Sequence, residues 1–387
     1  MVKAIKVMLI PNNVQKTKMF QYAGASRFAY NWALAREIEN YEKGGKFISD
    51  AELRKEFTKL RHSDEYAWLL NISNNVTKQA IKDACTAYKN FFRGLQKFPR
   101  FKSKKKSMPK FYQDNVKIRF SNTHVKFEGF SSSRKTNKQK MNWVRLAEHG
   151  CIPTDAKYMN PRISFDGLNW WISVCVEFPD CRETLNDDGV GIDLGIKDLA
   201  VCSDGTKYKN INKSQKVKKL EKQKRRLQRS ISRSYEKNKK GESYCKTNNV
   251  IKKEKLLLKR NHRLTNIRKN YLNQTISEIV NRKPRFICIE DLNVSGMMKN
   301  RHLSKAVQEQ GFFGFRKQLE YKCSDKGIQL IVADRFYPSS KLCSCCGNIK
   351  KDLKLSDRVY RCECGNMIDR DFQASINLKT YGEKFAS

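Results

Sequence analysis

The chain has 387 residues, with 79 lysines and arginines against 39 aspartates and glutamates, and a formal net charge of +40. This length is enough for two or three domains with cores of their own. A protein this positive repels itself, so its charge predicts a polyanionic partner rather than an ordinary soluble basic enzyme. The sequence has no apolar run near the roughly 20 residues that span a bilayer. We therefore expect no membrane association and a cytoplasmic, nucleoid-associated location.

The first part of the chain predicts one strand followed by helices. Residues 1–10 alternate between polar and apolar types as a strand does. From about Thr17 to Phe92, apolar residues recur at three- and four-residue spacing, which is typical of amphipathic helices. Pro99 and the lysine-rich run 102–110 then end the helical pattern and indicate a basic linker.

Residues 110–178 predict β-strands instead. Two apolar strands flank the Asp166-Gly167 dipeptide, a combination that indicates a hairpin. The polar, acidic stretch 179–189 marks the next boundary, and short buried strands joined by glycine-containing turns follow it. This part of the chain therefore predicts a β-rich domain and the start of a second sheet.

The segment 211–270 is strongly basic, with 22 lysines or arginines against four glutamates. Its apolar spacing predicts two long helices joined by the polar segment 235–249. A charged helix is often only a solvated face, but like charges destabilise a helix unless phosphates neutralise them. We therefore expect this segment to contact nucleic acid, with candidates in its first helix (Lys224, Arg225 and Arg226).

The remainder of the chain alternates strands with helices. A buried strand is predicted over 284–292, a helix over 311–327, a strand over 328–336 and a last helix over 371–385. Strands separated by long helices indicate a mixed α/β sheet.

Carboxylates occur where buried strands normally have none. Asp193 lies within GVGIDLGI, Glu290 ends the strand FICIE, and Asp369-Arg370-Asp371 opens the last helix. An ionised carboxylate in an apolar strand is costly unless a positive group pairs with it. A lysine partner could satisfy any one of them, but three acids at separate element ends fit a cage for Mg²⁺ better. Two such ions roughly 4 Å apart would activate water and stabilise a leaving oxygen.

Four of the 13 cysteines form two close pairs. Cys343-x-x-Cys346-Gly and Cys362-x-Cys364-Gly enclose a 15-residue insert, and thiolates at such spacing converge on one tetrahedral Zn²⁺. Cys345 could replace one ligand, and a disulfide is the alternative that a reducing compartment disfavours. The other nine cysteines are interpreted as small buried residues or free thiols. The four-thiolate site is expected to be closed and structural.

Three segments of the chain resemble the RuvC motifs of the TnpB/OrfB family of transposon-encoded RNA-guided nucleases. They are GIDLGIKDLA, IEDLNVSGM and CGNMIDRDFQASINL, and ADRFYPSSKLCSCCG between the last two also resembles the family. The N-terminal half resembles it more weakly, through YNWAL, QAIKDACTAYKNFF and FPRFKSKKK.

The resemblance implies that Asp193, Glu290 and Asp371 are the catalytic ligands of two Mg²⁺ ions. Asp371 is preferred to Asp369 because it stands two residues before the family's usual Asn, which is Gln373 here. Arg370 is then expected to contact phosphate, with a salt bridge to either neighbouring aspartate as the alternative.

The implied fold is a multidomain α/β protein, in which an RNase H-like (RuvC) nuclease with an inserted zinc ribbon accompanies a helical recognition lobe and a β-barrel-like wedge domain. The implied boundaries are 1–10 for the first wedge strand, 11–109 for the recognition domain, 110–185 for the wedge, 186–342 for the nuclease with its basic helical insertion 211–280, 343–364 for the zinc-binding domain and 365–387 for the final nuclease helix.

The implied partners are a guide RNA and a double-stranded DNA target, which the guide reads by base pairing while the protein reads a short adjacent motif. The helix with the family's motif-reading pattern places Asn75 and Gln79 one turn apart, where their amides can pair with adenine. Ordinary polar surface is the alternative for both. In the basic linker, Lys102, Lys104 and Lys105 are further candidates for nucleic-acid contact.

Three other functions are compatible with the same motifs. A compact type V CRISPR effector shares the nuclease and differs in its neighbouring DNA. A non-cutting, RNA-guided DNA-binding regulator would need no metal cage, so three intact acids argue against it. A strand-transferring transposase would give joined products rather than free ends. A monomer and a dimer on RNA are both left open.

Overall fold

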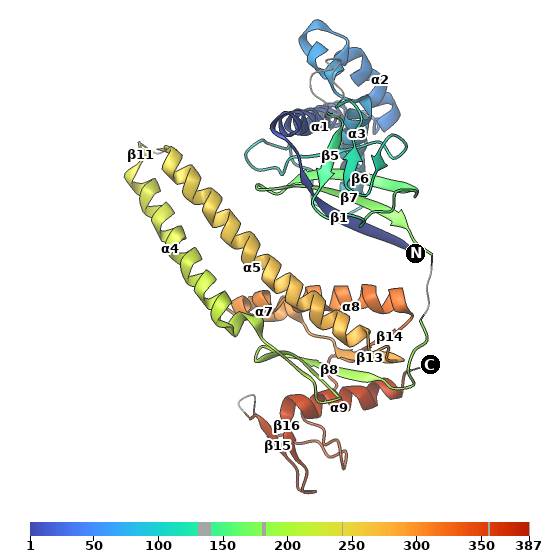
Figure 1. Cartoon of the computed structure of the whole chain (residues 1–387), viewed down its shortest axis with the longest axis vertical. Coiled ribbons are helices and arrows are strands. Elements are labelled where there is room, and N and C mark those ends of the chain that lie inside the picture. Colours follow the sequence, from blue (N-terminus) through green and yellow to red (C-terminus); the bar gives the residue numbers. More distant parts are fainter. Residues whose placement is uncertain (131–140, 180–182, 242, 355–356, 387) are drawn as a thin grey trace. The chain divides into compact units, whose positions relative to one another are not determined.

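The computed structural model describes residues 1–130, 141–179, 183–241, 243–354 and 357–386. They belong to two compact units, Met1–Pro179 and Asp180–Ser387 (Figure 1). The division falls within the acidic stretch 179–189.

The first unit contains the predicted helices. They are α1 (Asn13–Glu42), α2 (Asp50–Arg61) and α3 (Asn74–Phe92), with a 3₁₀ turn, η1 (Asp64–Asn71), between the last two. Capping boxes at Asn12 and Ser49 begin α1 and α2 by satisfying backbone N–H groups that lack helical partners. Alanines fully buried at four-residue spacing give α1 a smooth face, and α1 packs closely against α3 (Ala25, Ala29 and Ala33).

The same unit contains one antiparallel sheet of seven strands in the order β2-β6-β7-β1-β5-β4-β3. Its strands are β1 (Val2–Ile10), β2 (Lys110–Tyr112), β3 (Arg119–Phe120), β4 (His124–Lys126), β5 (Trp143–Leu146), β6 (Tyr158–Phe165) and β7 (Trp170–Glu177). Strands β6 and β7 form the predicted hairpin, in which Asp166 accepts hydrogen bonds from the backbone N–H groups of Leu168 and Asn169. Among the described residues β2 and β3 do not pair, so the sheet is not closed into the expected barrel.

The second unit is built on a mixed sheet of five strands in the order β10-β9-β8-β13-β14. Its strands are β8 (Val190–Leu194), β9 (Asp198–Cys202), β10 (Lys207–Lys209), β13 (Phe286–Glu290) and β14 (Gln329–Ala333). Strand β9 runs antiparallel to both β8 and β10, whereas β13 runs parallel to both β8 and β14. The carboxyl ends of β8, β13 and β14 therefore meet at one edge.

Helices cover both faces of this sheet (Figure 1). On one side, α5 (Asn248–Val280) packs against α8 (Phe312–Lys326); on the other, α9 (Arg370–Glu383) lies across β8, β9, β13 and β14. Strand alternation explains the two cores. Ile287 and Ile289 of β13 share a cluster with Phe315 of α8, whereas Cys288 shares another with Leu378 of α9. Two short helices, α6 (Val294–Lys299) and α7 (Ser304–Gln310), connect β13 to α8.

The basic segment forms the predicted pair of long helices. Helix α4 (Gln215–Lys237) follows a short turn, η2 (Ile211–Lys213). Two short strands, β11 (Lys239–Lys240) and β12 (Ser243–Tyr244), connect α4 to α5. Val217, Leu220 and Leu264 form a small apolar cluster between the helices. We call α4, α5 and their connection the basic arm.

After β14 the chain makes a small cysteine-bearing module. It includes an isolated pairing of Leu342 with Ile349 and an antiparallel hairpin of β15 (Val359–Arg361) and β16 (Met367–Asp369). In the described parts of the chain, none of the helices has the length and apolar character needed to cross a bilayer.

Candidate metal centres and nucleic-acid interface

The structure brings Asp193, Glu290 and Asp371 to one end of the mixed sheet. Ile192 of β8 pairs with Ile289 of β13, so the next residue of each parallel strand, Asp193 and Glu290, lies side by side with the other. Asp371 stands in the first turn of α9, which packs on both strands. Three distant segments therefore contribute one carboxylate each.

The pKa values of Asp193 and Glu290 are consistent with this close approach, because each acid is affected by the charge of another. Burial, followed by the charges of Glu290 and Asp371, raises the pKa of Asp193 well above its ordinary value. Burial also raises the pKa of Glu290, and the charge of Asp371 adds to it. In both cases Arg370 acts in the opposite direction. The acids repel one another, which is the condition that a bound cation relieves.

Asp369 and Asp371 have different surroundings. Asp369 caps α9 by accepting the Phe372 backbone N–H at 3.1 Å, and its carboxylate also lies 3.4 Å from the Lys207 ammonium. Although burial opposes it, this backbone hydrogen bond and the charge of Lys207 lower the pKa of Asp369. Asp371 instead has Arg370 at 3.6 Å, and Arg370 also donates to the Lys354 carbonyl at 3.3 Å. The geometry thus supports Asp371 as the member of the carboxylate group.

Sequence reasoning missed the residues that hold Glu290 and α9 in place. The Ser339 hydroxyl donates to Glu290, and Asn377 on α9 donates to the Ser339 carbonyl at 2.7 Å. Gln373, fully buried on α9, donates to the Leu342 carbonyl at 2.8 Å. Only Gln373 had been singled out, as a departure from the family's Asn, and nothing in its local sequence predicts this contact.

Asp291, next to Glu290, was also missed as a partner of two arginines. Its carboxylate accepts from Arg316 at 2.8 Å and from the Arg335 Nε at 3.0 Å. The Arg335 and Arg316 hydrogen bonds hold the pKa of Asp291 below its ordinary value. Asp291 therefore binds two arginines next to the site, and it is not one of the three clustered carboxylates.

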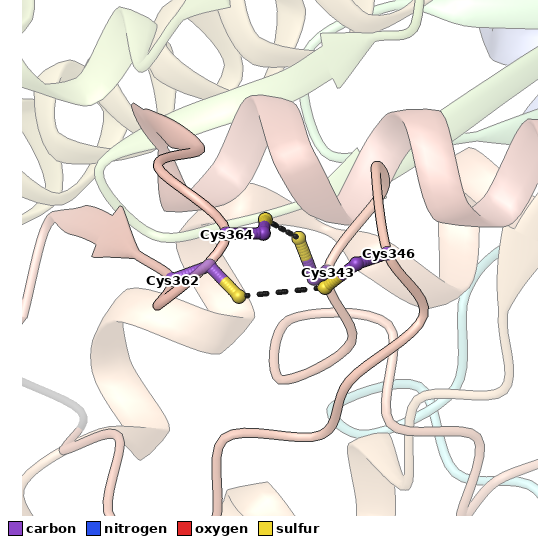
Figure 2. A group of neighbouring side chains, drawn as sticks. All are labelled: Cys343, Cys346, Cys362 and Cys364. Atoms are coloured by element: carbon purple, nitrogen blue, oxygen red, sulfur yellow. Dashed lines mark hydrogen bonds between the residues drawn. The ribbon is translucent and has the colours of Figure 1, made fainter.

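The four predicted cysteines converge, as Figure 2 shows. The Sγ atoms of Cys343, Cys346, Cys362 and Cys364 all lie within 4.8 Å of one another, with 3.7 Å between Cys343 and Cys364 and 3.6 Å between Cys346 and Cys362. Tetrahedral Zn²⁺ with bonds of about 2.3 Å requires sulfurs roughly 3.8 Å apart. The arrangement fits one such ion, and Cys345 lies outside it.

A glycine in the left-handed conformation follows each cysteine pair and allows a tight turn there. Gly347 and Gly365 have φ values of +75° and +89°, in the left-handed region that favours glycine, as the predicted tight turns require. Burial opposes ionisation of Cys343. Even so, hydrogen bonds from the Cys346 backbone, the Asn366 amide and the Cys345 backbone lower its pKa to about 6.

Asn75 and Gln79 are half-buried on α3, and acidic neighbours hold both side-chain amides. The Asn75 amide donates to Glu128 at 3.1 Å, and the Gln79 amide donates to Asp83 at 2.9 Å. Asp83 also binds Arg162 through two hydrogen bonds of 2.5 and 3.0 Å. The amide orientations are therefore fixed, because a carboxylate accepts and cannot donate.

The three linker lysines lie in different environments. Lys104 and Lys105 are exposed, whereas the Lys102 ammonium lies 3.0 Å from the centroid of the Tyr30 ring. Burial and the charge of Lys110 lower the pKa of Lys102 to about 7. Lys102 is therefore half-buried against a tyrosine ring, and its contact with nucleic acid stays a prediction.

The basic arm presents most of its charge to solvent. Arg225 and Arg226 are exposed on α4, while Lys224 is half-buried and lies 3.8 Å from Glu221. Glu221 also binds Arg268 of α5 at 3.1 Å, so this acid stabilises the packing of the two helices. Arg225 and Arg226 have the exposure that a phosphate contact requires.

Three family models match the chain. The "Probable transposase" model covers residues 173–301, the "Cas12f1-like, TNB domain" model covers 312–378, and a "Helix-turn-helix domain" model covers 1–46. Residues 1–46, which the third model matches, contain strand β1 and one helix, α1. They therefore do not form the two helices that the name of that model describes.

The mixed α/β fold is similar to that of a compact Cas12 protein. A Cas12f1 in complex with single guide RNA and target DNA is similar over 98% of both chains, with a TM-score of 0.60 and 12% identity. "Putative RNA-guided DNA endonuclease InsQ" of Escherichia coli (strain K12) is 31% identical over 93% of this chain and 87% of its own length. A "Putative RNA-guided DNA endonuclease" of Streptomyces pristinaespiralis is 28% identical over 98% and 89%. The chain belongs to the TnpB/OrfB family, which confirms the resemblance in its sequence.

Proposed function

We propose that the protein is a transposon-associated, RNA-guided endonuclease that hydrolyses double-stranded DNA in a Mg²⁺-dependent, RuvC-like site. The observation that carries the proposal is the convergence of Asp193 and Glu290, near the carboxyl ends of β8 and β13, with Asp371 in the first turn of α9. Relatives named as RNA-guided DNA endonucleases that match nearly the whole chain support a guide RNA and a DNA target as its partners.

An RNase H-like fold for residues 186–342 and 365–387 is part of this proposal. Its support is the mixed sheet, with three strands joined by antiparallel pairing, two further parallel strands, and a last helix that contributes an acid. Residues 11–109 would then form the recognition domain, 1–10 and 110–185 the wedge, and 211–280 an inserted arm.

The three carboxylates suit Mg²⁺ because they are oxygen donors, and because burial and the neighbouring acids raise the pKa of Asp193 and of Glu290 despite the opposing effects of Arg370 and Ser339. Bound there, Mg²⁺ would lower the pKa of water and stabilise charge on the scissile phosphate. Ser339 holds the Glu290 carboxylate by a hydrogen bond, and Arg370 is placed beside Asp371 to contact the phosphate.

The cysteine module, residues 343–364, would hold one structural Zn²⁺. Four thiolates leave no open position for substrate, so we assign this ion to folding and not to hydrolysis. Asn75 and Gln79 on α3 remain our candidates for reading the adjacent DNA motif, and Lys102, Lys104 and Lys105 for contact with nucleic acid.

The test is cleavage by the protein purified with RNA transcribed from its own locus. In Mg²⁺ the complex should cut a matching double-stranded target, and Asp193→Ala should lower the rate by about 10³-fold or more. Asp352→Ala, which removes an exposed acid of the cysteine module, is the matched control and should cut normally. A complex that binds its target without cutting in Mg²⁺ or Mn²⁺ would instead be a guide-directed regulator.

A compact type V CRISPR effector is the second candidate, because the Cas12f1 complex shares the fold over the whole chain. A Cas12f1 of Sulfoacidibacillus thermotolerans is also 29% identical over 76 residues. Sequencing of RNA that copurifies with the protein distinguishes the two, since a repeat-derived guide indicates an effector and a transposon-end guide indicates a TnpB.

A further inference from the structure

A pocket lies directly beside Glu290, at the carboxyl ends of the parallel strands. Its volume is about 380 Å³, within the range of small-molecule sites. Its lining includes apolar side chains from β8, β13, the loop before α6, the first residue of α6 and the start of α8 (Leu194, Ile289, Leu292, Val294, Phe312 and Phe313). It also includes three cations (Arg316, Lys317 and Arg335). We call this cavity the Phe313 pocket.

The two phenylalanines of this pocket have opposite environments. Phe312 is 2% exposed and packs in the core behind the sheet, whereas Phe313, the next residue on α8, is 64% exposed. A single exposed apolar ring is common on protein surfaces, so exposure alone does not assign Phe313 a partner. The relevant observation is that Phe313 lines the same pocket as Glu290 and the three cations, which is where a strand held at the acids would pass.

The cations are held before any substrate arrives. Asp291 accepts from both Arg316 and Arg335, and Arg316 also donates to Glu320 at 3.1 Å. Each guanidinium has five N–H donors, so these contacts leave others for phosphate oxygens. Fixing the arginines in advance reduces the entropy lost on binding.

Apolar side chains, an exposed aromatic ring and fixed cations around one pocket together match one nucleotide of a single strand. A base has a π-face that stacks on aromatic side chains, and its phosphate pairs with arginine and lysine. We propose that the Phe313 pocket binds the base of a nucleotide next to the scissile phosphate, with Arg316, Lys317 and Arg335 on the adjoining backbone. This inference rests on the proposed nuclease function, and it names the part of the substrate that the site holds.

A double substitution of protein and DNA tests the inference in the guide-loaded complex. Phe313→Ala should lower kcat/KM by roughly 5- to 150-fold on a target with all its bases, the range expected for one stacked base. On a target with an abasic site at the contacted position, found by scanning nucleotides on both sides of the cut, the same substitution should have almost no effect. Phe313→Trp should retain activity.

Phe336→Ala is the matched control. Phe336 is 87% exposed and follows Arg335, but it does not line the pocket, so its loss should not change the response to abasic sites. Equal losses with Phe313→Ala on intact and abasic targets would overturn the proposal, because the ring would then act on protein structure alone. No loss on either target would also overturn it, and would favour a protein segment as the occupant.

A binding measurement separates this proposal from the nuclease function. With Ca²⁺ in place of Mg²⁺, 2-aminopurine at the contacted position should be quenched on binding by stacking, and Phe313→Ala should restore its fluorescence. If the wild-type complex cut no DNA, the proposed function would fail while this signal still decided the pocket. If cutting were normal but no position responded to Phe313→Ala, only the pocket assignment would fail.

Discussion

Gly191 on β8 lies where this strand approaches α9 most closely, and its replacement by alanine would disturb how the acids are brought together. A Cβ atom added at Gly191 would lie 2.0 Å from the Ser375 carbonyl oxygen and 2.4 Å from the Lys379 backbone nitrogen. Both atoms belong to the backbone of α9, so no side-chain rotation can relieve the contact.

The displacement follows from these distances. Non-bonded heavy atoms pack at about 3.5–4.0 Å, so Gly191→Ala requires α9 to move away from β8 by more than about 1 Å. Asp371 begins this helix, whereas Asp193 stays on the strand. A misplacement of about 1 Å at a reaction centre can lower the rate about 10²-fold. Overpacking would also destabilise the second unit by about 1–3 kcal/mol.

The assay is single-turnover cleavage of a matched target by the guide-loaded complex, with a thermal melt to show that the variant is folded. We expect the single-turnover rate constant to fall about 100-fold while the affinity for target changes little, because the basic arm and the first unit are untouched. Gly314→Ala on α8 is the control, since its added Cβ meets no atom within 4 Å. Full activity of a folded Gly191→Ala protein would refute the close approach of α9 and β8 as the cause of the acid geometry.

Other parts of the molecule give predictions of the same kind. Cys343→Ser combined with Cys346→Ser should remove the single zinc found by metal analysis of the wild-type protein; retention of the metal would refute the four-thiolate site. Charge reversal of three basic residues on α4 (Lys224, Arg225 and Arg226) should weaken nucleic-acid binding and flatten its salt dependence, and an unchanged slope in a salt titration would mean that they face only solvent. Asp83→Asn should cost about 1.5–3 kcal/mol of stability at pH 7 by breaking the paired contact with Arg162. Burial opposes it, but the Arg162 and Gln79 hydrogen bonds lower the pKa of Asp83. The stabilisation is therefore present above the ordinary carboxyl value of about 4 and lost as pH falls below it, so chemical denaturation curves of variant and wild type should converge in acid.

The sequence predicted the elements of this fold well because their patterns are local. The alternation in residues 1–10, the Asp166-Gly167 turn, the two long helices of the basic segment and the apolar run before Glu290 each have a period or a turn signal of their own. The expected wedge barrel is less complete than predicted, since the described residues form an open sheet. Barrel closure depends on strand pairing between distant segments, which no local pattern reports.

The candidate site divides in the same way. A carboxylate inside an apolar strand contradicts its surroundings, and this made Asp193 and Glu290 visible in the sequence. The contacts of Ser339, Gln373 and Asp291 join segments tens of residues apart and use ordinary polar side chains, so no spacing rule singles them out. The half-buried position of Lys102 was hidden for the same reason, because a lysine-rich run predicts solvent contact for every member.

The hydrogen bonds of α9 also connect the two candidate metal centres. Leu342, which accepts from Gln373 and Asn377, immediately precedes Cys343, and Asn377 holds the carbonyl of the serine that contacts Glu290. An ion held by the thiols would order this loop and, through it, one of the acids. Loading of either centre should then change the affinity of the other by the same factor, as thermodynamic linkage requires. Removal of an ion from the thiols would in that case weaken the binding of a cation at the acids.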